Sequence, residues 1–198
     1  MYLPAEGDPV VGIVDDRGEA YRVELPGAPF PGLLGVLSFD GATKRNRPNL
    51  QIGDAVYCQV AAANPNVEPQ LTCASEGKGW MTGEARFGKL AKDKTTCIVR
   101  CSPKLCAVLE TTHPLLPALR RHFGGDDDGG GGGFKLAIGA NGAVWIRAAK
   151  TLDTTCIANA ILNADKLDDP TEVPPMVDRL VAAVNADHTI AGRFAATT

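Results

Sequence analysis

Short apolar runs separated by turn residues fill the first 75 residues of the chain and constrain its fold more than any other feature. Residues 9–14 form a β-branched run, and residues 20–25 alternate between polar and apolar side chains. Similar runs recur at 35–39, 55–61 and 71–73, with Gly, Pro and Asp residues between them. Runs of this length without helical periodicity predict β-strands. Five such strands predict a small closed barrel, because closure removes the exposed strand edges.

The pattern after residue 75 mixes strands and helices. Ser102 followed by Pro103 is a helix start, since a serine hydroxyl caps the first turn and proline fits there. Apolar residues then recur at helical spacing in several segments. This predicts an α+β domain with a tail that frays from Asp187. Its expected elements are strands over 77–87 and 95–101, helical pieces from 103 and over 115–123, strands over 134–138 and 143–147, a helix from Thr151 or Asp153, and a last helix over 174–184.

A short turn, Gly139-Ala140-Asn141-Gly142, separates two of the predicted strands. Asn-Gly between two alternating runs is a strong hairpin signal. The same residues have G-x-x-G spacing, which in nucleotide-clamping loops lies between two helices. Because this segment lies between strands, we expect Gly139, Asn141 and Gly142 to form a structural turn that packs against the first domain. An RNA clamp is the alternative.

Residues 124–133 consist almost entirely of Gly and Asp. The tract has few side chains to bury, so it predicts a mobile, solvated insertion. A phosphate-binding loop would need a preceding strand, a following helix and a Lys-Ser or Lys-Thr ending, and the tract lacks this pattern. Asp126, Asp127 and Asp128 could hold Mg²⁺ in principle, but a flexible tract does not preorganise a metal site.

The formal net charge of −3 is unevenly distributed. Residues 1–77 carry five Lys/Arg and ten Asp/Glu, residues 78–104 carry seven and two, and residues 105–198 carry eight and eleven. Domains that bind nucleic acid are often basic as a whole. Any nucleic-acid contact of this chain must therefore rest on local patches.

The six cysteines form no C-x-x-C pair. Three of them lie within residues 97–106, but structural zinc requires four ligands at paired spacing. We therefore expect no metal, no cofactor, and buried thiols in the reduced state. The N-terminus lacks the regions of a signal peptide, and no run reaches the roughly 18–20 apolar residues that span a bilayer. This predicts a soluble intracellular protein.

Catalytic residues are not apparent. The histidines are His113, His122 and His188, and none has a recognisable nucleophile or metal partner nearby in the sequence. We predict that the chain has no catalytic site.

A basic loop between two predicted barrel strands is the main candidate for binding. Lys44, Arg45, Asn46 and Arg47 lie together and end at Pro48. Small five-stranded barrels bind single strands of nucleic acid on one face and its adjoining loops. The three cations would neutralise about three phosphates, and Asn46 would hydrogen-bond the backbone or shape the turn. Contact with an acidic protein surface is an equal alternative for this loop.

Aromatic residues on such barrels stack against bases. Tyr21 and Tyr57 are the candidates here, although strand aromatics are more often buried. The second domain adds a possible basic face made of Lys78, Arg86, Lys89, Lys92 and Lys94.

Residues 37–54 closely resemble a segment of the S1 domain in the S1/KH-type cap subunits of the RNA exosome. The family segment reads approximately S-F-E-G-A-T-K-R-N-R-P-N-V-Q-V-G-D, and nearly every position from Ser38 matches. Asp40 replaces Glu and Leu50 replaces Val. Residues 11–14 resemble the family's first barrel strand, and residues 139–145 resemble its G-x-N-G turn with the strand that follows. The resemblance covers roughly residues 5–165.

The resemblance implies an S1-type (OB-fold) five-stranded β-barrel at 1–76 and a KH-like α+β domain at 77–190, with an insertion at 124–133 and a frayed tail at 191–198. It also implies a non-catalytic cap subunit that guides single-stranded RNA to a separate nuclease. Expected partners are RNase-PH-like ring subunits and other cap subunits, in the nucleus (including the nucleolus) and cytoplasm. A free-standing S1/KH adaptor and an S1/KH fragment of a 3′-exoribonuclease are the alternatives. The family begins with a further N-terminal domain, whereas this chain starts almost at the S1 segment.

Overall fold

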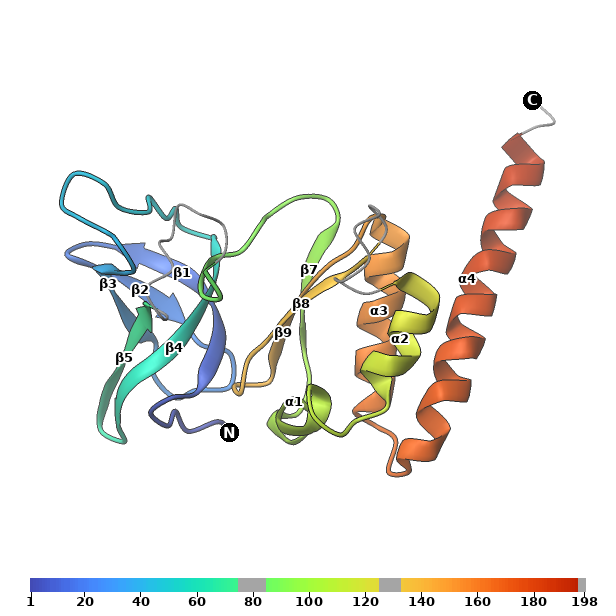
Figure 1. Cartoon of the computed structure of the whole chain (residues 1–198), viewed down its shortest axis with the longest axis horizontal. Coiled ribbons are helices and arrows are strands. Elements are labelled where there is room, and N and C mark those ends of the chain that lie inside the picture. Colours follow the sequence, from blue (N-terminus) through green and yellow to red (C-terminus); the bar gives the residue numbers. More distant parts are fainter. Residues whose placement is uncertain (75–84, 125–132, 196–198) are drawn as a thin grey trace.

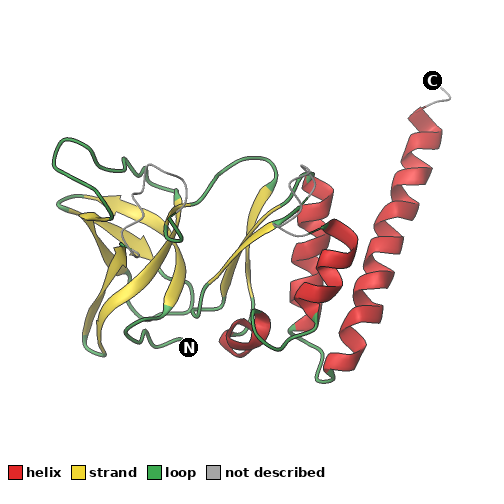
Figure 2. Ribbon diagram, in the orientation of Figure 1, coloured by secondary structure: helices red, strands yellow, loops and turns green. Residues whose placement is uncertain are grey.

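The computed structural model describes residues 1–74, 85–124 and 133–195, with side chains described as far as Asn185. The chain forms two lobes (Figure 1). A β-barrel at the N-terminal side lies next to a three-stranded sheet, and helices cover the far side of that sheet (Figure 2). Among the described helices, none is long and apolar enough to span a membrane.

The barrel contains five strands in the order β1-β2-β3-β5-β4, and β4 pairs back onto β1. This pairing closes the sheet. β3 and β5 run parallel, whereas the other neighbours in the barrel are antiparallel. The predicted five-stranded barrel is confirmed. Its strands are β1 (Pro9–Arg17), β2 (Ala20–Glu24), β3 (Gly32–Phe39), β4 (Ala55–Asn64) and β5 (Val67–Cys73), and a short β6 (Gly88–Lys89) adds to the outside of β4.

The second lobe is the predicted α+β region. Its sheet has the order β7-β9-β8 with antiparallel pairs throughout. The strands are β7 (Thr96–Arg100), β8 (Lys135–Ile138) and β9 (Ala143–Arg147); the helices are α1 (Pro103–Leu109), α2 (Leu115–Phe123), α3 (Thr151–Ala164), the 3-10 turn η1 (Pro170–Glu172) and α4 (Val173–Ala195).

The central strand β9 is buried on both faces. Ala143 and Trp145 belong to the core shared with the barrel. Val144 and Ile146 belong to the core beneath the helices. Alternate side chains of a strand point to opposite faces, so a strand between two cores must be apolar throughout. The sheet therefore contributes side chains to the hydrophobic cores of both lobes.

Two segments differ from the sequence prediction. Residues 77–84 of the expected strand 77–87 lie outside the described residues, and residues 85–87 are not a strand. The last helix runs to Ala195, well past the predicted end at 184. The part of the predicted frayed tail over 191–195 is therefore helical. Proline, the residue that most strongly breaks helices, does not occur between 185 and 195. The predicted domain boundary at 76/77 and most of the insertion at 124–133 lie outside the described residues.

Candidate nucleic-acid interface

The loop between β3 and β4 is fixed at its base by buried contacts. The hydroxyl of Tyr21 donates a 2.8 Å hydrogen bond to the carbonyl of Pro48. Leu50 is fully buried in the barrel core. On the outer side, the guanidinium of Arg17 donates to Gln51 Oε1 at 2.7 Å and to Asn49 Oδ1 at 2.8 Å. The base of the loop thus has a defined position on the barrel.

The tip of this loop carries the predicted cations. Thr43 and Asn46 exchange backbone hydrogen bonds of 2.8 and 3.1 Å, which closes a tight turn. The side chains of Lys44, Arg45, Asn46 and Arg47 are all exposed. In the described part of the chain, none of the three cations forms an ion pair. The structure therefore brings these four residues together on one fixed, solvent-facing turn.

The two candidate tyrosines lie inside the molecule. Tyr21 is 5% exposed and Tyr57 is 6% exposed. Their hydroxyls bond to backbone carbonyls, Tyr21 to Pro48 and Tyr57 to Ile138 at 3.1 Å. The ring of Tyr57 also packs against Phe87 with the centroids 5.0 Å apart. Neither ring offers a face to a base, so the prediction that they stack on RNA is wrong. Tyr21 fixes the basic loop, and Tyr57 joins the two lobes.

A second basic segment lies against the base of this loop. Lys89 Nζ forms a 2.6 Å ion pair with Asp54 Oδ2. Lys92 Nζ donates to the carbonyl of Gly53 at 3.1 Å. Arg86 lies over the ring of Phe87, 5.5 Å from its centroid. These contacts place the segment 85–92 beside the loop, an arrangement that sequence reasoning missed because it depends on one buried carboxylate.

A groove of about 510 Å³ lies between the base of this loop and the segment 85–91. Phe39, Pro48 and Asn49 line one side, and residues 85–91 line the other. Of the remaining predicted cations, Lys94 faces a different hollow with Lys135 and Arg147. Lys78 lies outside the described residues. The groove, with Arg86 and Lys89 on one side and the exposed loop tip at 44–47 beyond the other, is the candidate binding surface.

Asp54 holds the two sides of the groove together. Burial by itself would raise the pKa of this carboxyl. The Lys89 ammonium and the Gln51 amide, which donates at 2.7 Å, favour the ionised form more strongly. With Lys92 also nearby, the pKa of Asp54 lies below its ordinary value. Asp54 therefore stays ionised and paired at neutral pH.

Acid titration tests this anchor. The stabilisation by Asp54 is present above the unfolded-state pKa of about 3.9 and is lost as the pH falls through the lower folded pKa. We expect Asp54→Asn to reduce the free energy of unfolding by about 2 kcal/mol at neutral pH. The variant should also show a shallower loss of stability below about pH 4. Denaturant unfolding across this range measures both effects. Asp15→Asn, at an exposed position of β1, should change neither; equal effects from both variants would contradict the role of Asp54.

The turn at 139–142 lies against the barrel. Asn141 is 3% exposed. Its amide donates to Val11 O at 2.9 Å and Pro26 O at 3.3 Å, and its Oδ1 accepts from Val11 N at 3.2 Å. The amide of Ala140 donates to Pro9 O at 2.7 Å. A side chain on Gly139 would overlap Val11 N. The Asn141 side chain and the Ala140 amide thus join the turn to backbone atoms of the barrel. The space at these atoms is filled, so a nucleotide does not fit there.

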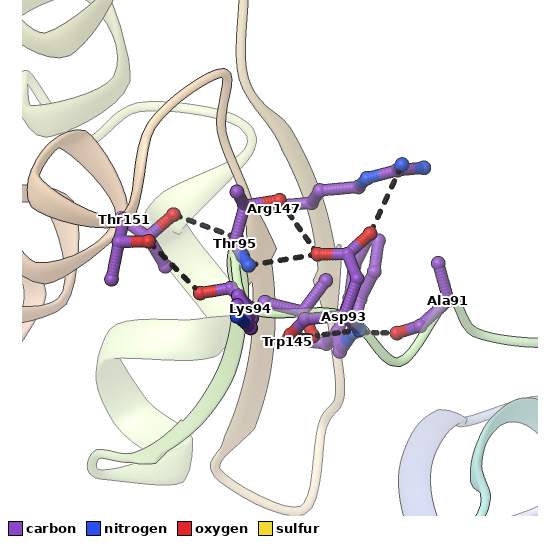
Figure 3. Close-up of polar contacts among 9 residues, drawn as sticks. Ala91, Asp93, Lys94, Thr95, Trp145, Arg147 and Thr151 are labelled. Atoms are coloured by element: carbon purple, nitrogen blue, oxygen red, sulfur yellow. Dashed lines mark hydrogen bonds and ion pairs between the residues drawn. The ribbon is translucent and has the colours of Figure 1, made fainter.

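A second joint between the lobes follows the basic segment (Figure 3). Trp145 Nε1 donates to the carbonyl of Ala91 at 3.1 Å. Asp93 accepts from the amide of Thr95 at 2.8 Å and pairs with Arg147 at 3.1 Å. Thr151 Oγ1 donates to Lys94 O at 3.1 Å. The second half of the segment 85–92 is thus held on both sides, by Asp54 of the barrel through Lys89 and by Trp145 of the sheet through Ala91.

Metal ligands are not clustered in the part of the chain that the structure describes. The described residues contain no group of three or more His, Cys, Asp or Glu side chains placed to hold a metal. His113 accepts a hydrogen bond from the amide of Leu115, and His122 pairs with Asp178. What the groove offers is positive charge on a fixed framework, which suits a polyanion.

Known proteins resemble this chain over most of its length. Residues 2–83 match the family model described as "Exosome complex component RRP40, S1 domain". The Drosophila melanogaster exosome complex component RRP40 is 35% identical over 163 residues, which is 81% of this chain and 62% of that protein. The human RRP40 is 34% identical over 82% of this chain and 54% of its own length. This chain therefore spans about half to six tenths of these relatives.

A Dictyostelium discoideum protein named "Putative exosome complex component rrp40" is 32% identical and matches 89% of this chain and 68% of its own length. A crystal structure of a "putative exosome complex RNA-binding protein" shares the fold, with a TM-score of 0.68 and 19% identity over 92% of this chain and 98% of that one. The barrel with its basic loop, the turn that docks on the barrel, and these matches agree: the chain belongs to the RRP40 family of exosome complex components.

Proposed function

We propose that this chain is a non-catalytic, RNA-binding cap subunit of the exosome. In this role it binds single-stranded RNA and guides it toward a separate nuclease that degrades it from the 3′ end. The observation that carries the proposal is the set of three exposed cations, Lys44, Arg45 and Arg47, without ion-pair partners in the described residues. They project from a turn that Tyr21 and Arg17 hold in place.

This geometry favours binding to the RNA backbone over reading of its sequence. Among the described residues, the aromatic rings that line the groove are Phe39 and Phe87, which are 3% and 7% exposed and offer little surface for stacking. Lys89 is committed to Asp54. The described charges near the groove without an ion pair are those of the loop tip, Arg86 and Lys92, and cations contact phosphates whatever the base. We therefore expect modest affinity, little sequence preference and strong dependence on salt.

Removal of the loop charges tests the proposal. For the triple variant Lys44→Ala, Arg45→Ala and Arg47→Ala, the slope of log K against log salt should fall by about 2, since each single-strand phosphate contact contributes about 0.7. At about 0.1 M salt the same loss corresponds to a ten- to hundredfold weaker affinity. Fluorescence anisotropy with a labelled oligouridine at several salt concentrations measures both.

A matched control separates this effect from net charge. Lys104, Lys150 and Lys166 are exposed on the second lobe, and their replacement by alanine makes the same change in net charge. The control should keep most of the affinity. If both triple variants weaken binding equally, the loop is not the RNA contact. If the loop variant binds RNA normally but loses the exosome ring on co-purification, the loop is a protein contact.

The proposed partners are RNase-PH-like ring subunits and other cap subunits, in the nucleus (including the nucleolus) and the cytoplasm. The names of the relatives, exosome complex components, support membership of this complex. Affinity purification of the tagged chain from cells should recover ring subunits, and imaging should show it in both compartments. The pure chain, incubated with labelled RNA and Mg²⁺, should leave the RNA intact; recovery of shortened RNA would favour an exoribonuclease instead.

A further inference from the structure

Two cysteines face each other at the start of the second lobe's helical layer. Cys101 directly follows β7, and Cys106 lies in α1. Their sulfur atoms are 3.4 Å apart, and both residues are free thiols. Cys101 is partly exposed, and Cys106 is 6% exposed. A disulfide has a sulfur–sulfur distance of about 2.05 Å, so the two atoms need to approach by only about 1.4 Å.

The backbone on both sides of this pair is held by hydrogen bonds. The amide of Cys101 donates to Gly142 O at 2.8 Å. Ser102 caps α1, since its Oγ accepts from the amide of Leu105 at 3.1 Å. The amide of Ser102 also donates to Asp165 Oδ2 at 2.9 Å, at the end of α3. These contacts hold the backbone on both sides of the pair, with the two sulfur atoms opposite each other.

We propose that Cys101 and Cys106 form an oxidation-sensitive dithiol, which hydrogen peroxide converts into an intrachain disulfide. The sulfur of Cys106, as the thiolate, attacks one peroxide oxygen; the O–O bond breaks, and the released hydroxide takes up a proton to become water. The Cys106 sulfenic acid that results is then attacked by the sulfur of Cys101. The S–S bond forms, the S–O bond breaks, and the second water leaves with the Cys101 proton. Two thiols and one peroxide give one disulfide and two waters.

The surroundings of the pair support Cys106 as the attacking sulfur. The hydrogen bond with Cys101 lowers the pKa of Cys106, against the opposing effects of burial and of Asp165. The same hydrogen bond raises the pKa of Cys101, which therefore keeps the shared proton. The thiolate is the reactive form of cysteine, and Cys101 is the neighbouring thiol that resolves the sulfenic acid.

The barrel contains a second pair that serves as an internal control. Cys58 and Cys73 lie on neighbouring strands with their sulfur atoms 3.6 Å apart. They are only 1% and 2% exposed, in the barrel core. The hydrogen bond with Cys73 and burial raise the pKa of Cys58. The two pairs thus have similar spacing but differ in access and in thiolate character, so peroxide should distinguish them.

Peptide mapping tests this directly on the full chain. Trypsin cuts after Arg100, Lys104 and Arg120, which places Cys101 in the peptide 101–104 and Cys106 in the peptide 105–120. After brief treatment of the folded protein with peroxide, alkylation and digestion, these two peptides should appear joined. Their combined mass should be two hydrogens below the sum, and dithiothreitol should separate them. Cys58 and Cys73, both within the peptide 46–78, should remain alkylatable on unfolding.

Replacement of the partly exposed Cys101 by serine tests the roles of the two thiols. Cys101→Ser should abolish the joined peptide and leave Cys106 with a sulfenic acid that dimedone traps. Circular dichroism of this variant checks that the fold is retained. The proposal is overturned if the two peptides stay separate with both thiols alkylated, if Cys58 and Cys73 pair at the same rate as Cys101 and Cys106, or if Cys101→Ser leaves Cys106 unreactive toward peroxide while the fold is intact.

Discussion

Replacement of Asn141 by alanine is expected to lower the free energy of unfolding by about 3–5 kcal/mol. The side chain makes three hydrogen bonds across the joint between the lobes, two with Val11 and one with Pro26. Alanine would leave three backbone groups without this partner in a site that is 3% exposed. Each buried polar group without a partner costs about 1–3 kcal/mol. Chemical denaturation with a fluorescence readout from Trp145, which packs at the same joint, measures the loss.

A surface asparagine gives the matched comparison. Asn159 is exposed on α3, and Asn159→Ala should change stability by less than about 0.5 kcal/mol or raise it slightly, since alanine favours helices. Asn141→Asp is a second test, because a carboxylate keeps an acceptor for Val11 N but has no donor for Val11 O or Pro26 O. We expect it to be nearly as destabilising as alanine. Wild-type stability for both Asn141 variants would mean that the joint does not depend on this side chain.

Much of the fold could be predicted from local patterns. Short β-branched runs predicted the barrel strands, and the Asn-Gly turn predicted the β8–β9 hairpin. Both signals depend only on residues that are close together in the sequence. The last helix was predicted too short, because no proline or clear capping residue marks where the helix ends after residue 184. Closure of the barrel by β1–β4 pairing joins residues more than 40 positions apart, such as Val11 and Tyr57; only the fold-level argument about strand edges predicted it.

The candidate site was predicted less completely than the fold. The cations at 44–47 could be found because they are contiguous in the sequence. Their exposure to solvent does not depend on a contact with a distant residue. Tyr21 and Tyr57 were misassigned because the local pattern around a strand tyrosine does not show whether its ring faces solvent or is buried. Tyr21 is hydrogen-bonded to Pro48 in the barrel's own loop, and Tyr57 to Ile138 of the second lobe. The opposite side of the groove depends on the pairing of Lys89 with Asp54, 35 positions earlier in the chain. No local pattern encodes such a pair.

Gly142→Ala is expected to lower the free energy of unfolding by about 3–4 kcal/mol for two separate reasons. Gly142 has φ of +77°, a region that costs a residue with a side chain about 1 kcal/mol or more. A Cβ at this position would also overlap the carbonyl oxygen of Cys101 and lie 3.4 Å from Pro103 Cδ. Neither neighbour is the end of a flexible side chain, so the backbone of the turn or of the segment before α1 must shift. Because the amide of Cys101 donates to Gly142 O, that shift disturbs the joint between the lobes.

Gly7 separates the two causes. It also has a positive φ, +91°, but a Cβ there meets nothing within 4 Å. Gly7→Ala should therefore lower the free energy of unfolding by only about 1 kcal/mol, the cost of a side chain at positive φ. Any larger loss in Gly142→Ala measures the steric overlap of the new Cβ with Cys101 and Pro103. Thermal and denaturant unfolding of both variants, with RNA affinity measured alongside, distinguish a structural turn from an RNA clamp. If residues 139–142 form a structural turn, Gly142→Ala should be less stable but should keep its RNA affinity below its melting temperature. If Gly142→Ala unfolds like the wild type but no longer binds RNA, residues 139–142 contact the RNA instead.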